Sequence, residues 1–279
     1  MALPILNNWE TYFDDYNEGL GSSYERIILN KLLLRLVKEY EVKEVLEAPI
    51  FGFTGITGLN SIELKRHGCN VTLLDDNAER IPKVRHIHAS MNQNLEVVEV
   101  QSYNILPFED NRFDMAWNFS ALWFVQDLRL FLSEFTRVSQ KIVLLCVPNQ
   151  YGLGYKWQKS HTDIPEGIHF NVSYIDPPLI KYIMRKLNWR LISEAFIDCP
   201  PWPDIGMSKE KFFGKITGRK STEKLVKDPA NKVSIVDYYK GNDPGFPAKM
   251  EKYAFLENNA PGAFKKIWSH HKWMLFKAD

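Results

Sequence analysis

The chain has 279 residues, and its 35 Lys and Arg against 34 Asp and Glu give a formal net charge of +1. A content of 45% hydrophobic and 25% charged residues is that of an ordinary globular protein, which excludes collagen-like, disordered and disulfide-scaffold chains. The length fits one large domain, or one domain with a substantial insertion. The near-neutral net charge gives no reason to expect a long nucleic-acid binding surface.

The cysteines and the N-terminus indicate the compartment. Cys69, Cys146 and Cys199 lie far apart and form no C-x-x-C pair, so neither a disulfide framework nor a cysteine zinc site is expected. The N-terminus is too acidic and too briefly apolar for a signal peptide, and no apolar run approaches the roughly 20 residues of a membrane-spanning helix. We therefore expect a cytoplasmic protein with no membrane partner.

The first part of the chain predicts a helix followed by a short buried strand. Apolar residues recur at helical spacing from Ser23 to Glu39, which predicts a helix there. The run from Glu44 to Ala48 stops at Pro49 and is typical of a buried strand. The elements predicted next are a helix over Asn60–Arg66 and strands over Val71–Leu74, Leu95–Val100 and Phe113–Trp117.

The middle of the chain continues this alternation of helix and strand. Helical periodicity over Asp127–Val138 precedes a continuously apolar run over Lys141–Val147, as buried parallel strands show. A helix over Pro177–Leu187 and a strand over Trp189–Ile197 follow, and His271–Lys277 again has strand character. The pattern predicts an α/β fold with a Rossmann-like, doubly wound, mostly parallel seven-stranded sheet.

The C-terminal part breaks the rhythm of strand and helix. Residues 200–266 hold seven of the 15 prolines and several short helical stretches, and we interpret them as a lid inserted before the last strand. His270 and His271 precede that strand and are expected at the surface or in the lid. The predicted organisation is an N-terminal helical cover over 1–41, a core over 42–199, the insertion over 200–266 and the final strand over 267–279.

A glycine-rich turn after the first strand is the most informative segment. Gly52, Gly55 and Gly58 precede the helix over Asn60–Arg66, and such a turn lets the backbone approach a ligand while helix N-terminal amides point at it. Asp75 ends the next strand 20 residues after Gly55, where an acidic side chain accepts ribose hydroxyls in Rossmann-type folds. The segment predicts an adenosine-containing ligand.

One interpretation of this turn is a dinucleotide site. Residues 52–58 (GFTGITG) resemble the NAD(P) loop of extended short-chain dehydrogenases, and Tyr155 with Lys159 supplies a Tyr-x-x-x-Lys. However, Tyr155 follows a Gly-Leu-Gly loop directly after a strand, where the dehydrogenase motif needs a long helix, and no Ser lies a turn upstream. An NAD(P)-dependent oxidoreductase is therefore the weaker interpretation.

The stronger interpretation rests on several segments in order. Residues 45–52 (VLEAPIFG) resemble the first motif of class I S-adenosylmethionine-dependent methyltransferases, and residues 106–115 (LPFEDNRFDM) resemble the LPF-x-D-x-x-FD run of the methyltransferase type 11 group. Residues 118–127 and 131–147 resemble the stretches that follow it. The resemblance covers about residues 42–199 at nearly the family spacing. It implies S-adenosyl-L-methionine as the cofactor and S-adenosyl-L-homocysteine as the product.

The resemblance also implies roles for individual residues. Glu47 would pair, directly or through water, with the amino group of the cofactor. Asp75 is the expected ribose acceptor with Asp76 as its competitor, because the alternation of the strand does not decide between neighbours. The full set of expected cofactor contacts is Glu47, Gly52, Gly55, Asp75, Asp76, Tyr103, Asn104, Asn118, Phe119 and Tyr24.

Some of these assignments have a plain structural alternative. Asn104 would bond the adenine amino group or cap a loop, because Ser102-Tyr103-Asn104 stands where many relatives carry an acidic residue. Asn118 and Phe119 end the fourth strand, at the edge where open α/β sheets bind ligands. The ring of Tyr24 would face the sulfonium cation, or its helix merely packs on the sheet.

The acceptor side departs from the family pattern. Trp123-Phe124 replaces the acidic–histidine pair that many relatives carry after the fourth strand, so His161 and His169 are the candidate catalytic bases. Trp123, Tyr155 and Trp202 are expected to line the acceptor pocket. A metal held by both histidines would need Asp163 as a third ligand, and we predict no metal site.

The predicted function is methyl transfer to a small or medium-sized acceptor at O, N, S or C. The alternatives are the oxidoreductase above, a macromolecular methyltransferase acting on tRNA or protein, and a scaffold protein that binds the cofactor without catalysis. A homodimer is left open.

The net charge conceals an uneven distribution along the chain. Residues 1–199 hold 20 basic and 25 acidic residues, whereas residues 200–279 hold 15 basic and nine acidic ones. A cationic lid would suit an anionic acceptor, although a solvated lysine-rich surface has the same composition. The basic C-terminal part also keeps a nucleic-acid partner open.

Overall fold

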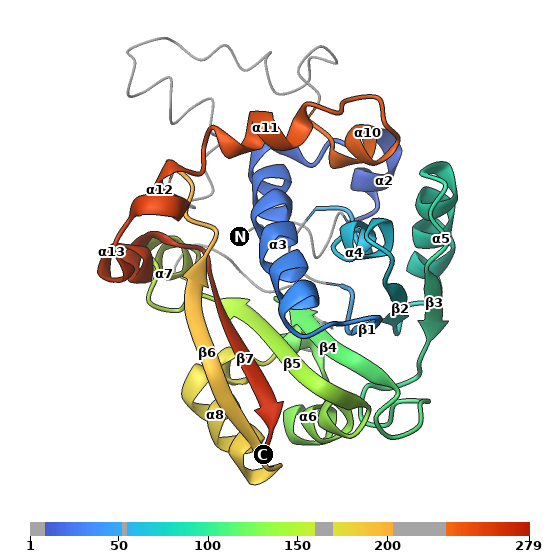
Figure 1. The fold of residues 1–279 in the computed structure, drawn as a ribbon, viewed down its shortest axis with the longest axis vertical. Coiled ribbons are helices and arrows are strands. Elements are labelled where there is room, and N and C mark those ends of the chain that lie inside the picture. Colours follow the sequence, from blue (N-terminus) through green and yellow to red (C-terminus); the bar gives the residue numbers. More distant parts are fainter. Residues whose placement is uncertain (1–8, 52–54, 160–169, 203–232) are drawn as a thin grey trace.

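The computed structural model describes residues 9–51, 55–159, 170–202 and 233–279. One seven-stranded sheet runs through it in the order β3-β2-β1-β4-β5-β7-β6, and β7 alone is antiparallel to its neighbours (Figure 1). This confirms the predicted fold class. The strands are β1 Glu44–Glu47, β2 Asn70–Asp75, β3 Glu96–Glu99, β4 Phe113–Phe119, β5 Ser139–Pro148, β6 Trp189–Ile197 and β7 His271–Ala278.

The register of β1 sets the place of the candidate site. Glu47 lies opposite Leu73 of β2 on one side and opposite Trp117 of β4 on the other. The strand order reverses direction at β1, because β1 pairs in parallel with β2 on one side and with β4 on the other. The carboxyl ends of β1, β2 and β4 therefore share one edge of the sheet. Ligands of open α/β sheets bind at such a point, outside the carboxyl ends of the strands.

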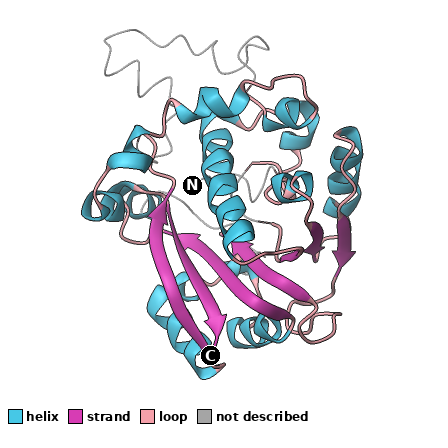
Figure 2. Cartoon of the chain, viewed as in Figure 1, coloured by secondary structure: helices cyan, strands magenta, loops and turns pink. Residues whose placement is uncertain are grey.

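Helices cover both faces of the sheet and bury one hydrophobic core on each (Figure 2). On one face lie α3 Gly19–Glu39, α4 Ile62–Arg66 and α5 Arg80–Ser90, and on the other lie α6 Leu128–Arg137 and α8 Pro177–Lys186. The two helices of the second face have clear start signals. Asp127 accepts hydrogen bonds from two amides of the first turn of α6, and Asp176 caps α8 ahead of a proline pair.

The segment between β6 and β7 has no strand within its described part and packs on the N-terminal helix. Its helices are α10 Ile235–Tyr239, α11 Phe246–Glu251, α12 Phe255–Asn259 and α13 Gly262–Trp268. The Nδ2 atom of Asn30 on α3 donates to the Tyr239 hydroxyl at 3.1 Å, and Lys31 pairs with Glu251 at 3.0 Å. These contacts extend the cover that α2 (Thr11–Asp15) and α3 form.

Two α-helices of the core, α5 and α7 (Leu153–Lys159), were not among the predicted elements. In α5 the apolar residues Ile81, Val84 and Ile87 face the core, but Pro82 and the histidines around them obscure the pattern. Pro82 is tolerated because it stands in the first turn, where its missing amide costs nothing. Tyr155 lies in α7, and the seven residues of this helix are too few for the long helix that the dehydrogenase motif needs. Within the described ranges, no helix is long and apolar enough to span a bilayer.

Candidate functional site

A buried carboxyl group ends β1 at the centre of the candidate site. Glu47 is 1% exposed, and each of its oxygens accepts one hydrogen bond, from Ser61 Oγ at 2.6 Å and from Asn60 Nδ2 at 3.1 Å. Burial raises the pKa of Glu47 to about 7 against the hydrogen bonds, which lower it. A carboxyl group can accept further bonds at both oxygens, so Glu47 keeps room for a donor from a ligand.

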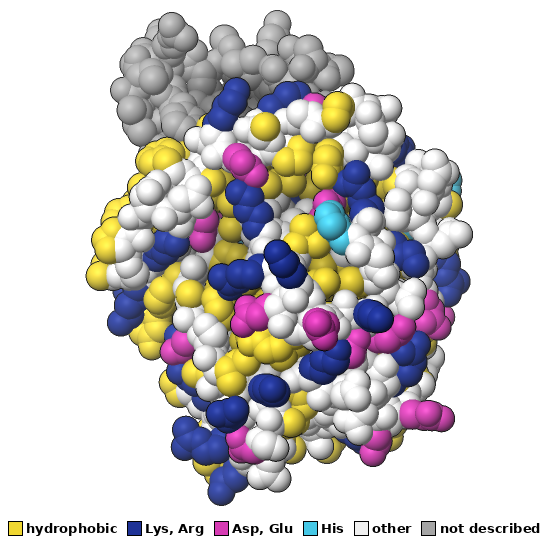
Figure 3. Space-filling model, viewed as in Figure 1, with side chains coloured by type: hydrophobic (Ala, Val, Ile, Leu, Met, Phe, Trp, Pro, Cys, Tyr) yellow, Lys and Arg dark blue, Asp and Glu magenta, His cyan; other side chains and the backbone are white. Residues whose placement is uncertain are grey.

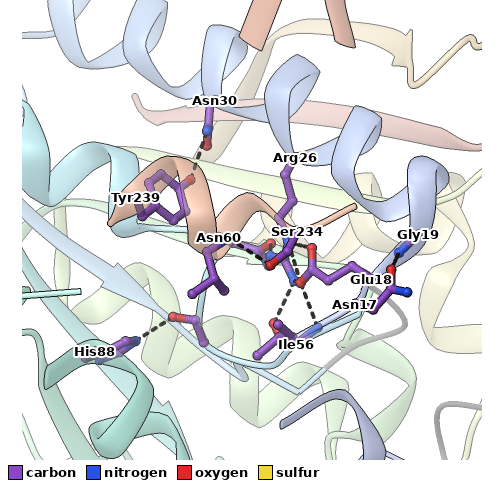
Figure 4. Close-up of polar contacts among 12 residues, drawn as sticks. Asn17, Glu18, Gly19, Arg26, Asn30, Ile56, Asn60, His88, Ser234 and Tyr239 are labelled. Atoms are coloured by element: carbon purple, nitrogen blue, oxygen red, sulfur yellow. Dashed lines mark hydrogen bonds and ion pairs between the residues drawn. The ribbon is translucent and has the colours of Figure 1, made fainter. Parts of the chain in front are cut away.

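A buried ion pair ties the N-terminal helix to the glycine turn (Figure 4). Arg26 of α3 donates to both carboxylate oxygens of Glu18, from Nε and from Nη2, each at 2.8 Å. It also donates to the carbonyl of Ile56 and to Asn60 Oδ1, and Glu18 accepts from the Ile56 amide at 2.9 Å. Because Asn60 in turn donates to Glu47, α3, the turn and β1 form one polar network.

The network explains why glycine stands at position 55. Gly55 has φ +48°, and an added Cβ would lie 2.9 Å from the carboxyl carbon of Glu18. Gly58, at φ +79°, leaves room for Val84 of α5. Two of the three glycines thus serve close approaches within the protein. Gly52, a predicted cofactor contact, lies outside the described residues.

The two acidic residues that end β2 have different surroundings. Asp75 is fully buried and accepts Arg80 Nη2 at 2.6 Å, Arg80 Nε at 2.9 Å and the Asn77 amide at 2.9 Å. The side chain of Asp76 is 34% exposed and lies 3.3 Å from Arg80 Nη2. Burial and the neighbouring Asp75 raise the pKa of Asp76. Both oxygens of Asp75 are therefore bonded within the chain, and Asp76 carries the accessible carboxyl group.

The loop after β3 lies beside this pair, because Val100 donates its amide to the Asp75 carbonyl at 3.0 Å. Tyr103 is buried and packs edge-on against Phe131, with ring centroids 6.2 Å apart. Asn104 Oδ1 is buried and has no hydrogen-bond partner within the described part of the chain. A buried polar atom without a partner is uncommon and suits a ligand donor.

At the end of β4, the side chain of Asn118 bonds to backbone groups of the protein, whereas we expected it to contact the cofactor. Its Nδ2 donates to the Ala48 carbonyl at 2.9 Å, and its Oδ1 accepts from the Ala121 amide at 3.3 Å. Asn118 is fully buried, so within the structure its amide holds the segment that follows β1. Phe119 packs against His271 with ring centroids 4.6 Å apart.

The residues expected on the acceptor side are mostly buried aromatics. The Trp123 indole donates to the Ser120 carbonyl at 2.8 Å, and Tyr24 meets Trp202 edge-on with centroids 5.6 Å apart. Tyr155 is partly buried against the second core. His161 and His169 lie outside the described residues, and their catalytic role stays a prediction.

The expectation that His271 lies at the surface or in the lid is wrong. His271 is 2% exposed because β7 is paired with β5 on one side and β6 on the other, and α3 covers it. His270 keeps 12% of its side chain exposed and bonds Asp198. A polar pair just before a strand gave no signal that the strand is internal to the sheet.

Comparison with known proteins gives a family-model match over part of the chain and a shared fold. Residues 53–146 match the family model described as a methyltransferase domain. No curated protein matches the sequence. A protein of Galdieria sulphuraria provisionally assigned as a sarcosine dimethylglycine methyltransferase shares the fold with TM-score 0.52 and 11% identity, over 89% of this chain and 84% of its own. A SAM-dependent methyltransferase from Thermotoga maritima has TM-score 0.52 and 14% identity, over 74% of this chain and 87% of its own.

These findings confirm the resemblance found in the sequence. The chain has the fold of class I methyltransferases, and residues 53–146 match a methyltransferase domain. The match favours the methyltransferase interpretation of the glycine turn over the dehydrogenase one. It implies S-adenosylmethionine as the cofactor, and the residues fit this group: Glu47 can receive an ammonium, Asp76 a ribose, and the unpartnered oxygen of Asn104 an amino group.

Proposed function

We propose that this protein transfers a methyl group from S-adenosylmethionine to a small or medium-sized acceptor. The observation that carries the proposal is the row of polar groups on adjacent strand ends, Glu47 at the end of β1, Asp76 after β2 and Asn104 after β3, of which Asp76 and Asn104 lie inside the matched methyltransferase domain. The spacing of these strands suits the amino acid, ribose and adenine parts of one extended ligand.

Each residue has a stated role in this proposal. Glu47 accepts a hydrogen bond from the ammonium of the cofactor. The positive charge of that ammonium favours the ionised form of Glu47, whose pKa burial otherwise raises. Asp76 accepts the ribose hydroxyls, while the buried Asp75–Arg80 pair fixes the turn that presents it. Asn104 accepts from the adenine amino group through its Oδ1.

The bound cofactor supplies an activated methyl group on a sulfonium, and the protein aligns the nucleophile and excludes water. Trp202, which we expect on the acceptor side, packs edge-on against Tyr24 with ring centroids 5.6 Å apart, and such apolar rings support an organic acceptor. On the face in Figure 3, dark blue and magenta side chains are interspersed, whereas a nucleic-acid footprint clusters positive charge.

The test is label transfer from methyl-labelled S-adenosylmethionine into separated fractions of a cell extract. We expect label in the small-molecule fraction with the wild-type protein and none above background with Glu47→Gln. Label confined to tRNA or protein would contradict the acceptor class. Cofactor binding without transfer into any fraction would instead indicate a non-catalytic scaffold.

A further inference from the structure

A second group of ionisable side chains lies at the same edge of the sheet, outside the set just described. Glu25 comes from α3, Asp198 follows β6, and His271 begins β7, so three distant parts of the chain converge. One side-chain ligand atom of each residue lies within 4.8 Å of the other two. We call Glu25, Asp198 and His271 the edge triad.

The distances within the edge triad are those of ligands around an ion. His271 Nδ1 lies 3.5 Å from Glu25 Oε2 and 3.6 Å from Asp198 Oδ2, which is too far for good hydrogen bonds. Two ligands that each stand about 2.1 Å from an ion, at a tetrahedral angle, are about 3.4 Å apart. The separations therefore leave room for an ion between the three atoms.

Several polar atoms of the edge triad have no hydrogen-bond partner within the described residues: both ring nitrogens of His271, Asp198 Oδ1 and Glu25 Oε1. The side chains of Asp198 and His271 are 3% and 2% exposed, so water does not satisfy them from bulk solvent. Buried polar atoms are normally paired, and His271 Nδ1 is both unpaired and the atom that faces the Glu25 and Asp198 carboxyl groups, which indicates a missing partner at this point.

The edge triad brings two carboxyl groups together with one imidazole. The two carboxyl groups lie side by side in a buried place; no Lys or Arg of the described residues forms an ion pair with either, and Asp198 pairs with His270. A neutral imidazole is the form that ligates a metal.

The backbone around Asp198 is held in an unusual conformation. Asp198 has φ +64°, a left-handed value that is unfavourable for a non-glycine residue. His270 Nδ1 lies 2.7 Å from Asp198 Oδ2, and the His270 amide donates to the Asp198 carbonyl at 2.9 Å. A histidine bonded to a carboxylate ligand is a common way to orient that ligand.

We propose that Glu25, Asp198 and His271 bind one divalent transition-metal ion, with His270 orienting Asp198. One imidazole and two carboxylates suit Zn²⁺ or Mn²⁺ better than Mg²⁺, which prefers oxygen ligands and bound water. Three protein ligands leave at least one coordination position open, as in catalytic rather than structural zinc sites.

The site lies toward the acceptor side of the sheet rather than at the Glu47 and Asp76 end. The ring of His271 packs on Phe119 at the end of β4, and His271 pairs with Pro148 at the end of β5. A bound ion would place positive charge there. Metal binding does not depend on the proposed methyl transfer, so either proposal can fail without the other.

The test uses the full chain after dialysis against a chelator, titrated separately with Zn²⁺, Mn²⁺ and Mg²⁺ by calorimetry. We expect one Zn²⁺ or Mn²⁺ per chain, weaker Mg²⁺ binding, and a rise in melting temperature with the bound ion. Glu25→Gln keeps the shape of the side chain and should weaken Zn²⁺ binding by at least about 10-fold. His271→Gln should abolish it, and His86→Gln, at an exposed histidine, is the matched control.

Substitution with Co²⁺ gives a second readout that does not depend on stability. We expect visible absorption bands from nitrogen and oxygen ligands, lost in Glu25→Gln and kept in His86→Gln. The proposal is overturned if the folded wild-type chain binds neither Zn²⁺ nor Mn²⁺, or if Glu25→Gln binds them as tightly as the wild type does.

Discussion

Asp75 and Asp76 are neighbours in the sequence, yet their side chains have different surroundings in the structure. Asp75 is buried against Arg80, and Asp76 keeps the accessible carboxyl group. We expect Asp76→Asn to weaken binding of S-adenosylhomocysteine by about 10-fold or more, because hydrogen bonds to charged groups contribute about 1.5–3 kcal/mol. Calorimetry measures this, with Asp110→Asn at an exposed carboxylate as the control.

Asp75→Asn should act on stability instead. It leaves the buried Arg80 guanidinium without its main partner, and breaking a buried pair in this way costs about 3–5 kcal/mol. Urea unfolding of both variants separates the two roles. A stable Asp75→Asn protein that has lost the ligand would reverse the assignment.

Glu47 links stability to pH. Its pKa rises from the ordinary value of 4.5 to about 7 on burial, so the folded state binds more protons than the unfolded state between these values. The free energy of unfolding should therefore fall as pH rises through this window, by at most about 3 kcal/mol on account of this group. Glu47→Gln removes the contribution.

Urea unfolding at pH 5 and pH 8 tests this linkage. The wild type should lose more stability than Glu47→Gln between the two values. Equal losses would mean that the buried carboxyl does not titrate in this range.

At the scale of elements, the Arg26–Glu18 pair fastens α3 to the glycine turn. Both side chains are no more than 1% exposed. Glu18→Gln leaves the buried Arg26 guanidinium without a negatively charged partner, and should destabilise the fold by about 3–5 kcal/mol. The pair Lys31–Glu251 joins α3 to α11 but is 47% exposed on each side. Lys31→Gln should cost less than about 1 kcal/mol, and equal costs for both variants would contradict this account.

Elements with a clear period could be predicted, and contacts between distant residues could not. The strands and α6 were indicated because their apolar residues follow one period, and the distance from Gly55 to Asp75 marked the ligand edge. Nothing in the local sequence pairs Glu18 with Arg26, or turns Arg80 back onto Asp75, because these bonds form only once the turn and helices are placed. The predicted histidine bases lie outside the described residues.

At the scale of the whole molecule, strand order brings two polar sets to one edge of the sheet. The ends of β1, β2 and β3 carry the proposed cofactor residues, and the ends of β6 and β7 carry the edge triad. Strands β4 and β5 lie between these two polar sets in the sheet. In the proposed function, one side of this edge holds the cofactor and the other holds the acceptor.

The most direct measurement is a calorimetric titration of the wild-type chain with S-adenosylhomocysteine and, separately, with NAD and NADP. We expect one S-adenosylhomocysteine bound per chain and no heat of binding with either dinucleotide. A folded protein that binds a dinucleotide, or that gives no heat with S-adenosylhomocysteine, would contradict it.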